Sequence, residues 1–260
     1  MKRRAFTMVE VLVVAGVTSV LIALSLTGVR GAQQASRSVK CKNNLRQMVL
    51  ASHHYGACSQ GHVPPAILYY QRQGVSRTVA WDFEIQNGQA KPGSLWKFTD
   101  RPQEVQQCPD CPQPDVSETE PFTGYHYNTS YLAAEGLLPE TTADGFVKDG
   151  WKRVRAGVSP GQWRRTAETA MFADGGWARG ANKFMRAPSA TVENDLGMVY
   201  AGGSAFRHRE QCHVAWLDAH VESVGEPFQG IRAQPGLLKA LMDWPNNGFL
   251  SNDDSAYDPR

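Results

Sequence analysis

The N-terminal part of the chain combines an uninterrupted apolar stretch with an amphipathic one. Residues 11–29 are nineteen positions without a charged side chain. In a helix they would cover about 30 Å, the thickness of the hydrocarbon core of a membrane. From residue 32 to residue 55, apolar and small side chains recur at helical spacing, forming a stripe of Cys41, Leu45, Met48, Val49, Ser52 and Tyr55. The opposite side is polar, with Arg37, Lys40, Lys42, Asn43 and Arg46. The pattern therefore predicts one helix from about residue 6 to residue 55, ended by Gly56, Gly61 and Pro64-Pro65.

Beyond Pro65, short apolar runs alternate with turn-forming residues, which is typical of strands joined by loops. Strands are expected over residues 67–70, 78–83 and 169–173. Turns are expected over residues 86–89 and, directly after the third strand, over 174–176. Residues 84–121, rich in Gln, Pro and Asp, are interpreted mainly as a long connection.

The clearest strand pattern is a hairpin near the C-terminus. His213, Ala215 and Leu217 alternate with Cys212, Val214 and Trp216, after which the chain turns at Asp218-Ala219 and returns over residues 220–224. A two-residue type I′ turn needs φ > 0 at both central positions, which costs an alanine about 1 kcal/mol, so another turn type or slight strain is expected. The whole pattern predicts an α+β fold. Its long N-terminal helix, transmembrane in the first half and amphipathic in the second, packs on an antiparallel β-sheet head with long loops.

Two charged features flank the apolar stretch. Lys2, Arg3 and Arg4 precede it, and Glu10 lies at its head. A carboxylate in hydrocarbon costs about 2.5–3.5 kcal/mol, so Glu10 needs a partner there. A plain signal anchor has the required length but leaves Glu10 unexplained, and a secretory signal peptide has a shorter apolar core. The basic cluster predicts a cytoplasmic N-terminus and an exported head.

The basic residues followed by Ala5-Phe6-Thr7-Met8-Val9-Glu10 resemble the type IV prepilin leader shared by pilins and type II secretion pseudopilins. In that family a prepilin peptidase in the membrane cuts before the Phe and methylates the new amine. The glutamate then pairs with that amine in the filament. The resemblance implies cleavage between Ala5 and Phe6, N-methylation of Phe6, an assembly role for Glu10 and a pilin-like fold. The family usually has Gly at the position of Ala5.

Further motifs agree with this resemblance. The segment Cys41-Lys42-Asn43-Asn44-Leu45-Arg46-Gln47-Met48 resembles a Cys-x-Asn-Asn-Leu-Lys-Gln stretch that follows the leader in one pseudopilin-like family. His208, nine residues and Asp218 match the His-x9-Asp-Gly signature of the prepilin-type processing-associated family, with Ala219 in place of the Gly. Cys108-Pro109 and the segment 124–128 resemble its Cys-Pro and aromatic Tyr-x-x-Asn stretches. The resemblance implies no activity for the head.

Charge and size narrow the function classes. The formal net charge of +2 becomes −1 after loss of Lys2, Arg3 and Arg4, because 24 basic side chains then face 25 acidic ones. A nucleic-acid-binding protein needs a sustained basic face, so nucleic acid is not expected as a partner. The residues beyond the apolar stretch suffice for one domain with its own core.

Two groups of residues are candidates for metal binding. His208, His213, Asp218 and His220 offer ligands that suit zinc. However, His208 and His213 are five residues apart, which on a regular strand places them on opposite faces. A structural role is favoured, in which Asp218 binds turn amides and His208 a nearby backbone group. The acidic tail over residues 252–258 offers oxygen ligands for calcium, but terminal acidic residues are usually solvated and mobile. No metal and no cofactor is expected.

The cysteines indicate an oxidising compartment without settling their pairing. There are five, Cys41, Cys58, Cys108, Cys111 and Cys212, so at least one is unpaired if the others form bridges within the chain. Export favours a disulfide, and the most useful one would tether Cys108 or Cys111 to the helix at Cys41 or Cys58. Zinc at Cys108-Pro-Asp-Cys111 and free thiols are the alternatives.

The sequence thus predicts a prepilin-like subunit of a type II secretion or type IV pilus-like assembly. Its expected partners are the prepilin peptidase, other pilin-like subunits and the lipid of the inner membrane. The segments are a leader (1–5), a transmembrane and assembly half of the helix (6–30), an amphipathic half (31–58) and a periplasmic head (59–260). The alternative is a membrane-anchored periplasmic binding protein with no filament role. No Ser-His-Asp order or nucleophile elbow is evident, so an enzyme is not expected.

Overall fold

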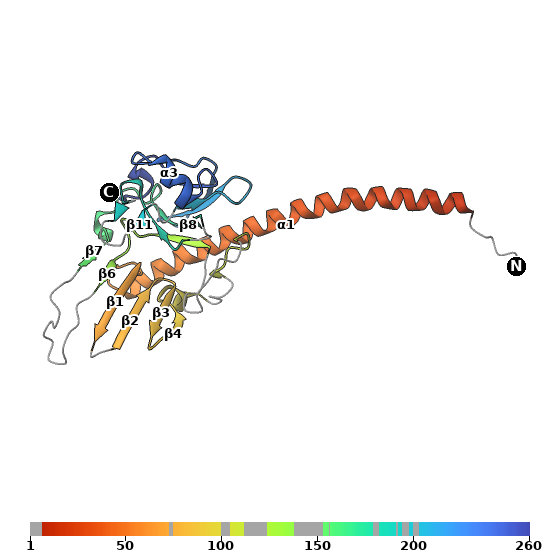
Figure 1. Ribbon diagram of the computed structural model, residues 1–260. Coiled ribbons are helices and arrows are strands. Elements are labelled where there is room, and N and C mark those ends of the chain that lie inside the picture. The colour runs from red at the N-terminus through yellow and green to blue at the C-terminus, as the bar shows by residue number, and fades with distance from the viewer. Residues whose placement is uncertain are drawn as a thin grey trace. The chain divides into compact units, whose positions relative to one another are not determined.

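The computed structural model describes residues 7–72, 75–99, 105–111, 124–137, 153–155, 157–178, 182–190, 192–193, 198–199 and 203–260. The chain divides into two compact units, residues 1–39 and residues 40–260. The expected cleavage site, Ala5 and Phe6, lies outside the described residues. The fold is α+β, as predicted, with a long apolar N-terminal helix and β-sheets (Figure 1).

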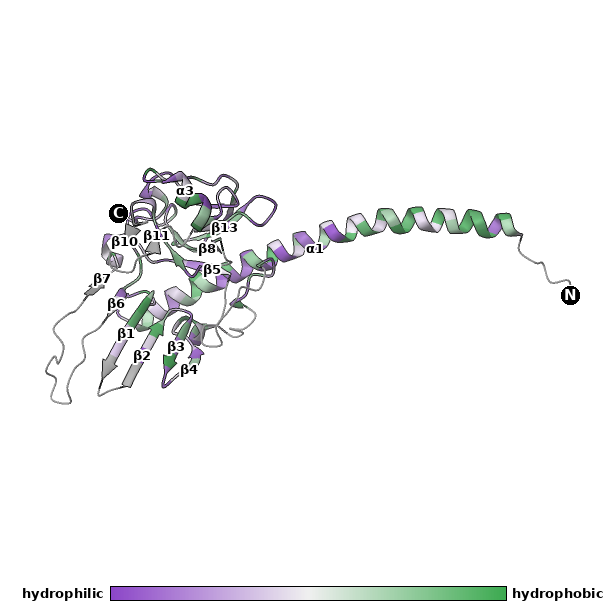
Figure 2. Ribbon diagram, in the orientation of Figure 1, coloured by the Kyte–Doolittle hydropathy of each residue, from purple (hydrophilic) through white to green (hydrophobic). Residues whose placement is uncertain are grey.

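Helix α1 (Met8–Cys58) is continuous, as the periodicity predicts. It begins with a capping box, because the Thr7 amide donates to Glu10 Oε2 at 2.8 Å and the Glu10 amide donates to Thr7 Oγ1 at 3.3 Å. The helix contains an apolar stretch long enough to cross a membrane, and none of that stretch is buried. Figure 2 shows the hydrophobic colouring of the first half giving way to a mixed pattern in the second. After Cys58 the chain turns at Gly61, whose amide donates to Gly56 O at 2.8 Å and whose φ is +83°.

The predicted stripe of the second half of α1 is confirmed. The described residues buried along it are Cys41, Asn44, Leu45, Met48, Val49, Ala51, Ser52 and Gly56. Tyr55 is half-buried and meets the ring of Phe98 edge to face, with centroids 6.0 Å apart. On the polar side Lys40, Asn43 and Arg46 are exposed. The helix therefore packs on the head through one face only.

A six-stranded sheet has the order β4-β3-β2-β1-β6-β7. Its strands are β1 (Ile67–Arg72), β2 (Val75–Ala80), β3 (Phe83–Gln86), β4 (Gln89–Pro92), β6 (Glu135–Leu137) and β7 (Arg153–Arg155). All neighbours are antiparallel except β1 and β6, which are parallel. The turn between β3 and β4 is confirmed, with φ of 52° at Asn87 and 74° at Gly88, the signs of a type I′ turn.

Two predictions in this region are wrong. The expected strand over residues 78–83 is two strands, because the chain bends at Trp81 and Asp82. The expected long connection over residues 84–121 contains β4 and the 3₁₀ helix η1 (Leu95–Phe98). The side chains of Leu95 and Trp96 are buried in the core, which composition alone did not reveal.

A second sheet of seven strands is built around β8 (Ala170–Gly176). Its main path is β14-β13-β8-β12-β15, and β5 pairs with β8 and, in parallel, with β9. The other strands are β5 (Tyr125–Asn128), β9 (Phe184–Met185), β12 (Gly203–Ala205), β13 (Cys212–Trp216), β14 (Val221–Val224) and β15 (Asn247–Gly248). The expected tight turn at residues 174–176 is wrong, since these residues continue β8 and pair with β12 and β5. A separate pair is formed by β10 (Val192–Glu193) and β11 (Met198–Val199).

The remaining elements are short. They are η2 (Pro160–Gln162), η3 (Pro188–Ala190), α3 (Pro235–Leu237), the π-helical turn η4 (Leu238–Met242) and η5 (Asp254–Ala256). The acidic tail packs on the head, contrary to the expectation of a solvated tail: Tyr257 is buried, and Asp254 accepts hydrogen bonds from the Tyr131 hydroxyl and from Ser189 N. The Asp254 carboxylate, one of the candidate calcium ligands, therefore binds protein donors.

The core of the head has two main clusters on opposite faces of β13. Ala215 and Leu217 belong to the cluster under α1, with Trp81, Tyr125, Tyr127 and Phe172. Cys212, Val214 and Trp216 belong to a second cluster with the C-terminal segment. The predicted alternation of this strand is therefore confirmed, and both faces of β13 are buried.

The hairpin turn differs from the type I′ turn. The Ala219 amide donates to Trp216 O at 2.9 Å and the Trp216 amide to His220 O at 3.0 Å, which makes a three-residue loop. Ala219 has φ of 73°, in the left-handed position that glycine favours in such loops. The Gly of the resembled signature would fit this position without strain.

Gly157 offers a direct test of the packing beside Leu132. A Cβ added at Gly157 would lie 1.9 Å from Leu132 O, whereas one added at Gly161 meets nothing within 4 Å. Replacing Gly157 by alanine is expected to lower the free energy of unfolding by about 3 kcal/mol, the upper range for overpacking, because a backbone atom must move. Urea unfolding followed by circular dichroism measures this, and Gly161→Ala, within about 1 kcal/mol of the parent chain, is the matched control. Equal effects of the two substitutions would contradict the close approach.

Candidate functional site

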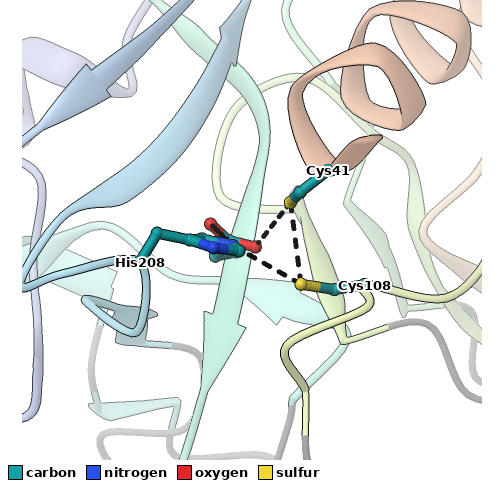
Figure 3. Close-up of side chains that lie close together, drawn as sticks. Cys41, Cys108 and His208 are labelled. Carbon is teal, nitrogen blue, oxygen red and sulfur yellow. Dashed lines mark hydrogen bonds and ion pairs between the residues drawn. The ribbon is translucent and has the colours of Figure 1, made fainter. Parts of the chain in front are cut away.

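Four buried side chains from distant parts of the head converge in its interior. They are Cys41 of α1, Cys108 of the loop after η1, Asp174 of β8 and His208 of the turn before β13. One potential ligand atom from each lies within 4.8 Å of the others. Figure 3 shows the Cys41 and Cys108 sulfurs and the His208 ring pointing toward one another.

The distances within this tetrad are short. Cys41 Sγ lies 3.6 Å from Cys108 Sγ and 3.2 Å from Asp174 Oδ1. His208 Nε2 lies 3.5 Å from Cys108 Sγ and 3.2 Å from Asp174 Oδ2. The other ring nitrogen, Nδ1, lies 3.0 Å from Asp110 Oδ2. His208 is therefore held on both edges of its ring by acidic groups.

The backbone around His208 explains its orientation. The amides and carbonyls of His208 and Gln211 are bonded to each other at 3.0 and 3.2 Å, and Arg209 and Glu210 have φ of 54° and 63°. This is a two-residue turn at Arg209 and Glu210. His208 and Gln211 face each other across it, so their side chains lie on the same side of the turn. His213, two residues after Gln211, lies on that same side.

The prediction that His208 and His213 lie on opposite faces is therefore wrong. It holds only for a regular strand from His208 to His213, and the turn between them reverses the alternation. Their rings stack with centroids 4.1 Å apart and an interplanar angle of 10°. The expectation that the His208 side chain binds a nearby backbone group is also wrong, because the bonds described for this ring run to side chains.

The loop of Cys108 is held by residues of the resembled motifs. Asn44 Nδ2 donates to Gln107 O and to the Tyr125 hydroxyl, both at 3.2 Å. Gly124, with φ of 66°, passes so close to this loop that an added Cβ would lie 2.7 Å from Cys111 Cβ. The motifs around residues 41–45, 108–109 and 124–128 thus meet at one place in the fold.

The tetrad is strongly polarised. Burial raises the pKa of Asp174, but the hydrogen bond to His208 and the nearby Arg207 outweigh it and hold that pKa at about 2. Burial lowers the pKa of His208, yet Asp174 and Cys108 raise it to about 10. The contact with the Cys41 thiol, followed by the hydrogen bond with His208, lowers the pKa of Cys108 to about 6 against the effect of burial. Burial raises the pKa of Cys41. These pKa directions favour anionic Cys108 and Asp174 next to a protonated His208.

Arg207 lies next to the tetrad without entering it. Its guanidinium donates to Gly175 O, and the charges of Asp174 and the nearby thiols raise its pKa although burial opposes this. Asp174 Oδ2 also accepts from the His213 amide at 2.9 Å. These contacts fix the Asp174 carboxylate in place.

The other sequence candidates lie elsewhere in the chain. Asp218 Oδ1 accepts a hydrogen bond from the His220 amide at 3.1 Å, as expected of a turn aspartate. The same oxygen lies 2.6 Å from Nδ1 of the exposed His220 ring. Cys58 is exposed at the end of α1. All five cysteines are free thiols, with Cys41 and Cys108 adjacent, and their pairing in an oxidising compartment stays a prediction.

Sequence reasoning missed two carboxylates of the site. The sequence pattern predicts a turn at Asp174, and it gives Asp110 no role beyond spacing Cys108 from Cys111. Only Asp174 has a sequence signal that indicates a role. It directly follows an apolar strand, where a charged residue is costly to bury unless it has partners. Nothing local identifies Asp110.

No family model matches the chain, and neither a curated protein nor a solved structure matches it. The function is therefore argued from the helix and the site alone.

Proposed function

We propose that the chain is a prepilin-like subunit of a type II secretion or type IV pilus-like assembly. It is anchored in the inner membrane by α1, with its N-terminus in the cytoplasm and its head in the periplasm. The prepilin peptidase removes residues 1–5 and methylates the amine of Phe6. The subunit then packs with other pilin-like subunits in the lipid.

The observation that carries this proposal is the two-part character of α1. One helix runs from Met8 to Cys58, with an exposed membrane-length apolar stretch and a later face buried in the head. An ordinary anchor does not need to continue into the core of its head, whereas in the pilin plan one helix serves both the lipid and the head. The basic residues Lys2, Arg3 and Arg4 favour the cytoplasmic N-terminus.

Glu10 has two partners in this proposal. In the single chain its carboxylate accepts from the Thr7 amide and from Thr7 Oγ1 at 2.8 and 2.9 Å. In the assembly it neutralises the Phe6 amine of a neighbouring subunit, which supplies the countercharge that a carboxylate in hydrocarbon needs.

Mass spectrometry of the protein extracted from membranes tests the processing step. The expected N-terminus is N-methyl-Phe6, and it depends on the prepilin peptidase. An intact Met1 terminus that is the same in cells lacking the peptidase would refute the proposal and indicate a plain anchor. A cut after the apolar stretch would indicate a secretory signal.

The substitution Glu10→Gln tests the assembly step separately. Glutamine keeps the capping box with Thr7 but removes the charge. Membrane insertion and cleavage should be unchanged, while crosslinking into assemblies should fall more than tenfold, because the unpaired amine costs about 2.5–3.5 kcal/mol in lipid. Thr7→Val, which removes the cap and keeps the carboxylate, is the matched control and should still crosslink. Normal crosslinking of Glu10→Gln would exclude the pairing.

A further inference from the structure

We propose that Cys41, Cys108, Asp174 and His208 bind one structural zinc ion in the interior of the head. This inference is independent of the proposed function, since it concerns only residues 40–260. The sequence set of His208, His213, Asp218 and His220 is not the ligand set. Only His208 belongs to both.

The spacing of the four ligand atoms fits tetrahedral zinc. Bonds of about 2.3 Å to sulfur and about 2.0 Å to nitrogen or oxygen place two thiolates about 3.8 Å apart, and a thiolate about 3.5 Å from an imidazole nitrogen. The corresponding distances are 3.6 Å between the sulfurs and 3.5 Å between Cys108 Sγ and His208 Nε2. Asp174 Oδ1 lies 3.2 Å from the Cys41 sulfur, and Asp174 Oδ2 lies 3.2 Å from His208 Nε2. These distances are close to the edge lengths of a tetrahedron around zinc, and one ligand atom from each residue lies within 4.8 Å of the others.

The surroundings of His208 match those of a metal ligand. A zinc-bound histidine usually donates its other ring N–H to a carboxylate, which fixes the tautomer and the ring plane. Asp110 Oδ2 lies 3.0 Å from His208 Nδ1 and provides this contact. The other ring nitrogen, Nε2, faces Cys108 Sγ. Asp110 is therefore a positioning residue, and it belongs to the same turn as the ligand Cys108.

Charge balance favours a divalent cation. As zinc ligands, Cys41 and Cys108 would both lose their protons, and with the Asp174 carboxylate they would place three negative charges in a buried site. A divalent ion and the adjacent Arg207 guanidinium neutralise them. Two sulfur ligands with one imidazole select zinc over magnesium or calcium, which prefer oxygen ligands.

The geometry assigns a structural rather than a catalytic role. Four protein ligands complete the usual coordination of zinc, and all four side chains are buried, so no position is left open to a substrate. The ion would connect α1, the Cys108 loop, β8 and the turn before β13. It would therefore link the packed half of the helix to the central strand of the second sheet.

The competing state of the same residues is a disulfide between Cys41 and Cys108. Their sulfurs are 3.6 Å apart, which is longer than a disulfide bond of about 2.05 Å. Oxidation would remove two ligands at once, so the chain contains either the zinc or this bridge. The two states differ in metal content and in mass.

The test uses the full chain purified in detergent without reducing agent, with metals measured by inductively coupled plasma mass spectrometry. The expected content is about one zinc per chain. Replacing zinc by cobalt should give the absorption of tetrahedral, thiolate-bound Co²⁺. Removal of zinc by a chelator should lower the melting temperature of the head by at least about 5 °C.

Variants locate the ion. Cys41→Ser and Cys108→Ser should each lose most of the zinc and the thiolate-to-cobalt absorption. Cys212→Ser, a buried thiol outside the tetrad, should retain both and controls for general loss of packing. Asp110→Asn should bind zinc with about 10- to 100-fold weaker affinity while the head stays folded.

Two results would overturn the proposal. One is a metal-free chain, lighter by two hydrogens, whose digest contains a Cys41–Cys108 crosslinked peptide. The other is equal zinc content in Cys41→Ser, Cys108→Ser and the parent chain. If the serine variants fail to fold, the cobalt spectrum and chelator response of the parent chain still decide, because both need no substitution.

Discussion

Replacing Glu135 by glutamine is expected to lower the free energy of unfolding of the head by about 3–5 kcal/mol, because it leaves Arg186 charged and buried without its counterion. Glu135 lies in β6 of the six-stranded sheet, and Arg186 directly follows β9, which pairs with the second sheet. The guanidinium donates to both carboxylate oxygens, at 2.6 and 2.7 Å. The two side chains are only 8% and 4% exposed. Urea unfolding of the full chain in detergent, followed by circular dichroism, measures the loss.

A surface pair provides the matched control for this experiment. Arg77 and Glu84 also form an ion pair at 2.7 Å, but the Arg77 side chain is 48% exposed. Glu84→Gln should therefore cost no more than about 1 kcal/mol. Replacing Arg186 and Glu135 together by apolar residues of similar size should recover most of the lost stability. Equal losses for Glu135→Gln and Glu84→Gln would show that the buried pair does not connect the sheets as described.

Truncating Trp81 to alanine is expected to cost about 3–5 kcal/mol, the range for removing a large aromatic side chain from a core. Trp81 is fully buried beneath α1 and contacts the rings of Trp96, Tyr127 and Phe172, with centroid distances of 6.1, 5.9 and 5.5 Å. The cavity would open at the centre of the cluster that joins the helix to both sheets. The same urea experiment measures it.

Trp81→Phe separates ring packing from the indole N–H. Among the described residues Trp81 Nε1 has no hydrogen-bond partner, so phenylalanine loses volume but no bond. Its cost should be less than half that of Trp81→Ala. If Trp81→Phe were as unstable as Trp81→Ala, the indole N–H would have to make a stabilising hydrogen bond within the cluster.

The resembled motifs gain a common physical explanation if the zinc proposal holds. Asn44 of the Cys-x-Asn-Asn-Leu segment supports the loop of Cys108, and Cys41 from the same segment supplies a ligand atom. His208 of the His-x9-Asp signature supplies another, and Asp218 stabilises the turn at the other end of strand β13. Motifs distant in the sequence would then serve one buried site and the strand that leads to it.

The sequence determined the elements whose signals are local. The continuous helix α1 follows from its apolar stretch and its later stripe through Cys41, Leu45 and Met48, because helical periodicity is independent of the rest of the chain. The hairpin of β13 and β14 follows from strict alternation in the same way. Thr7 and Glu10 are also spaced as a capping box, so the start of α1 has a local signal in the sequence as well.

Only the tertiary structure decided the pairing of distant residues. Asp174 became the centre of the site because β8 lies between β5 and β13, a position set by long-range pairing rather than by its neighbours in sequence. The short turn at Arg209 and Glu210 moved His208 to the side of His213, since two residues with positive φ reverse the alternation of a strand. The four ligand atoms come from residues 41, 108, 174 and 208. No spacing rule links such positions, because their proximity arises only when both sheets and the second half of α1 share one core.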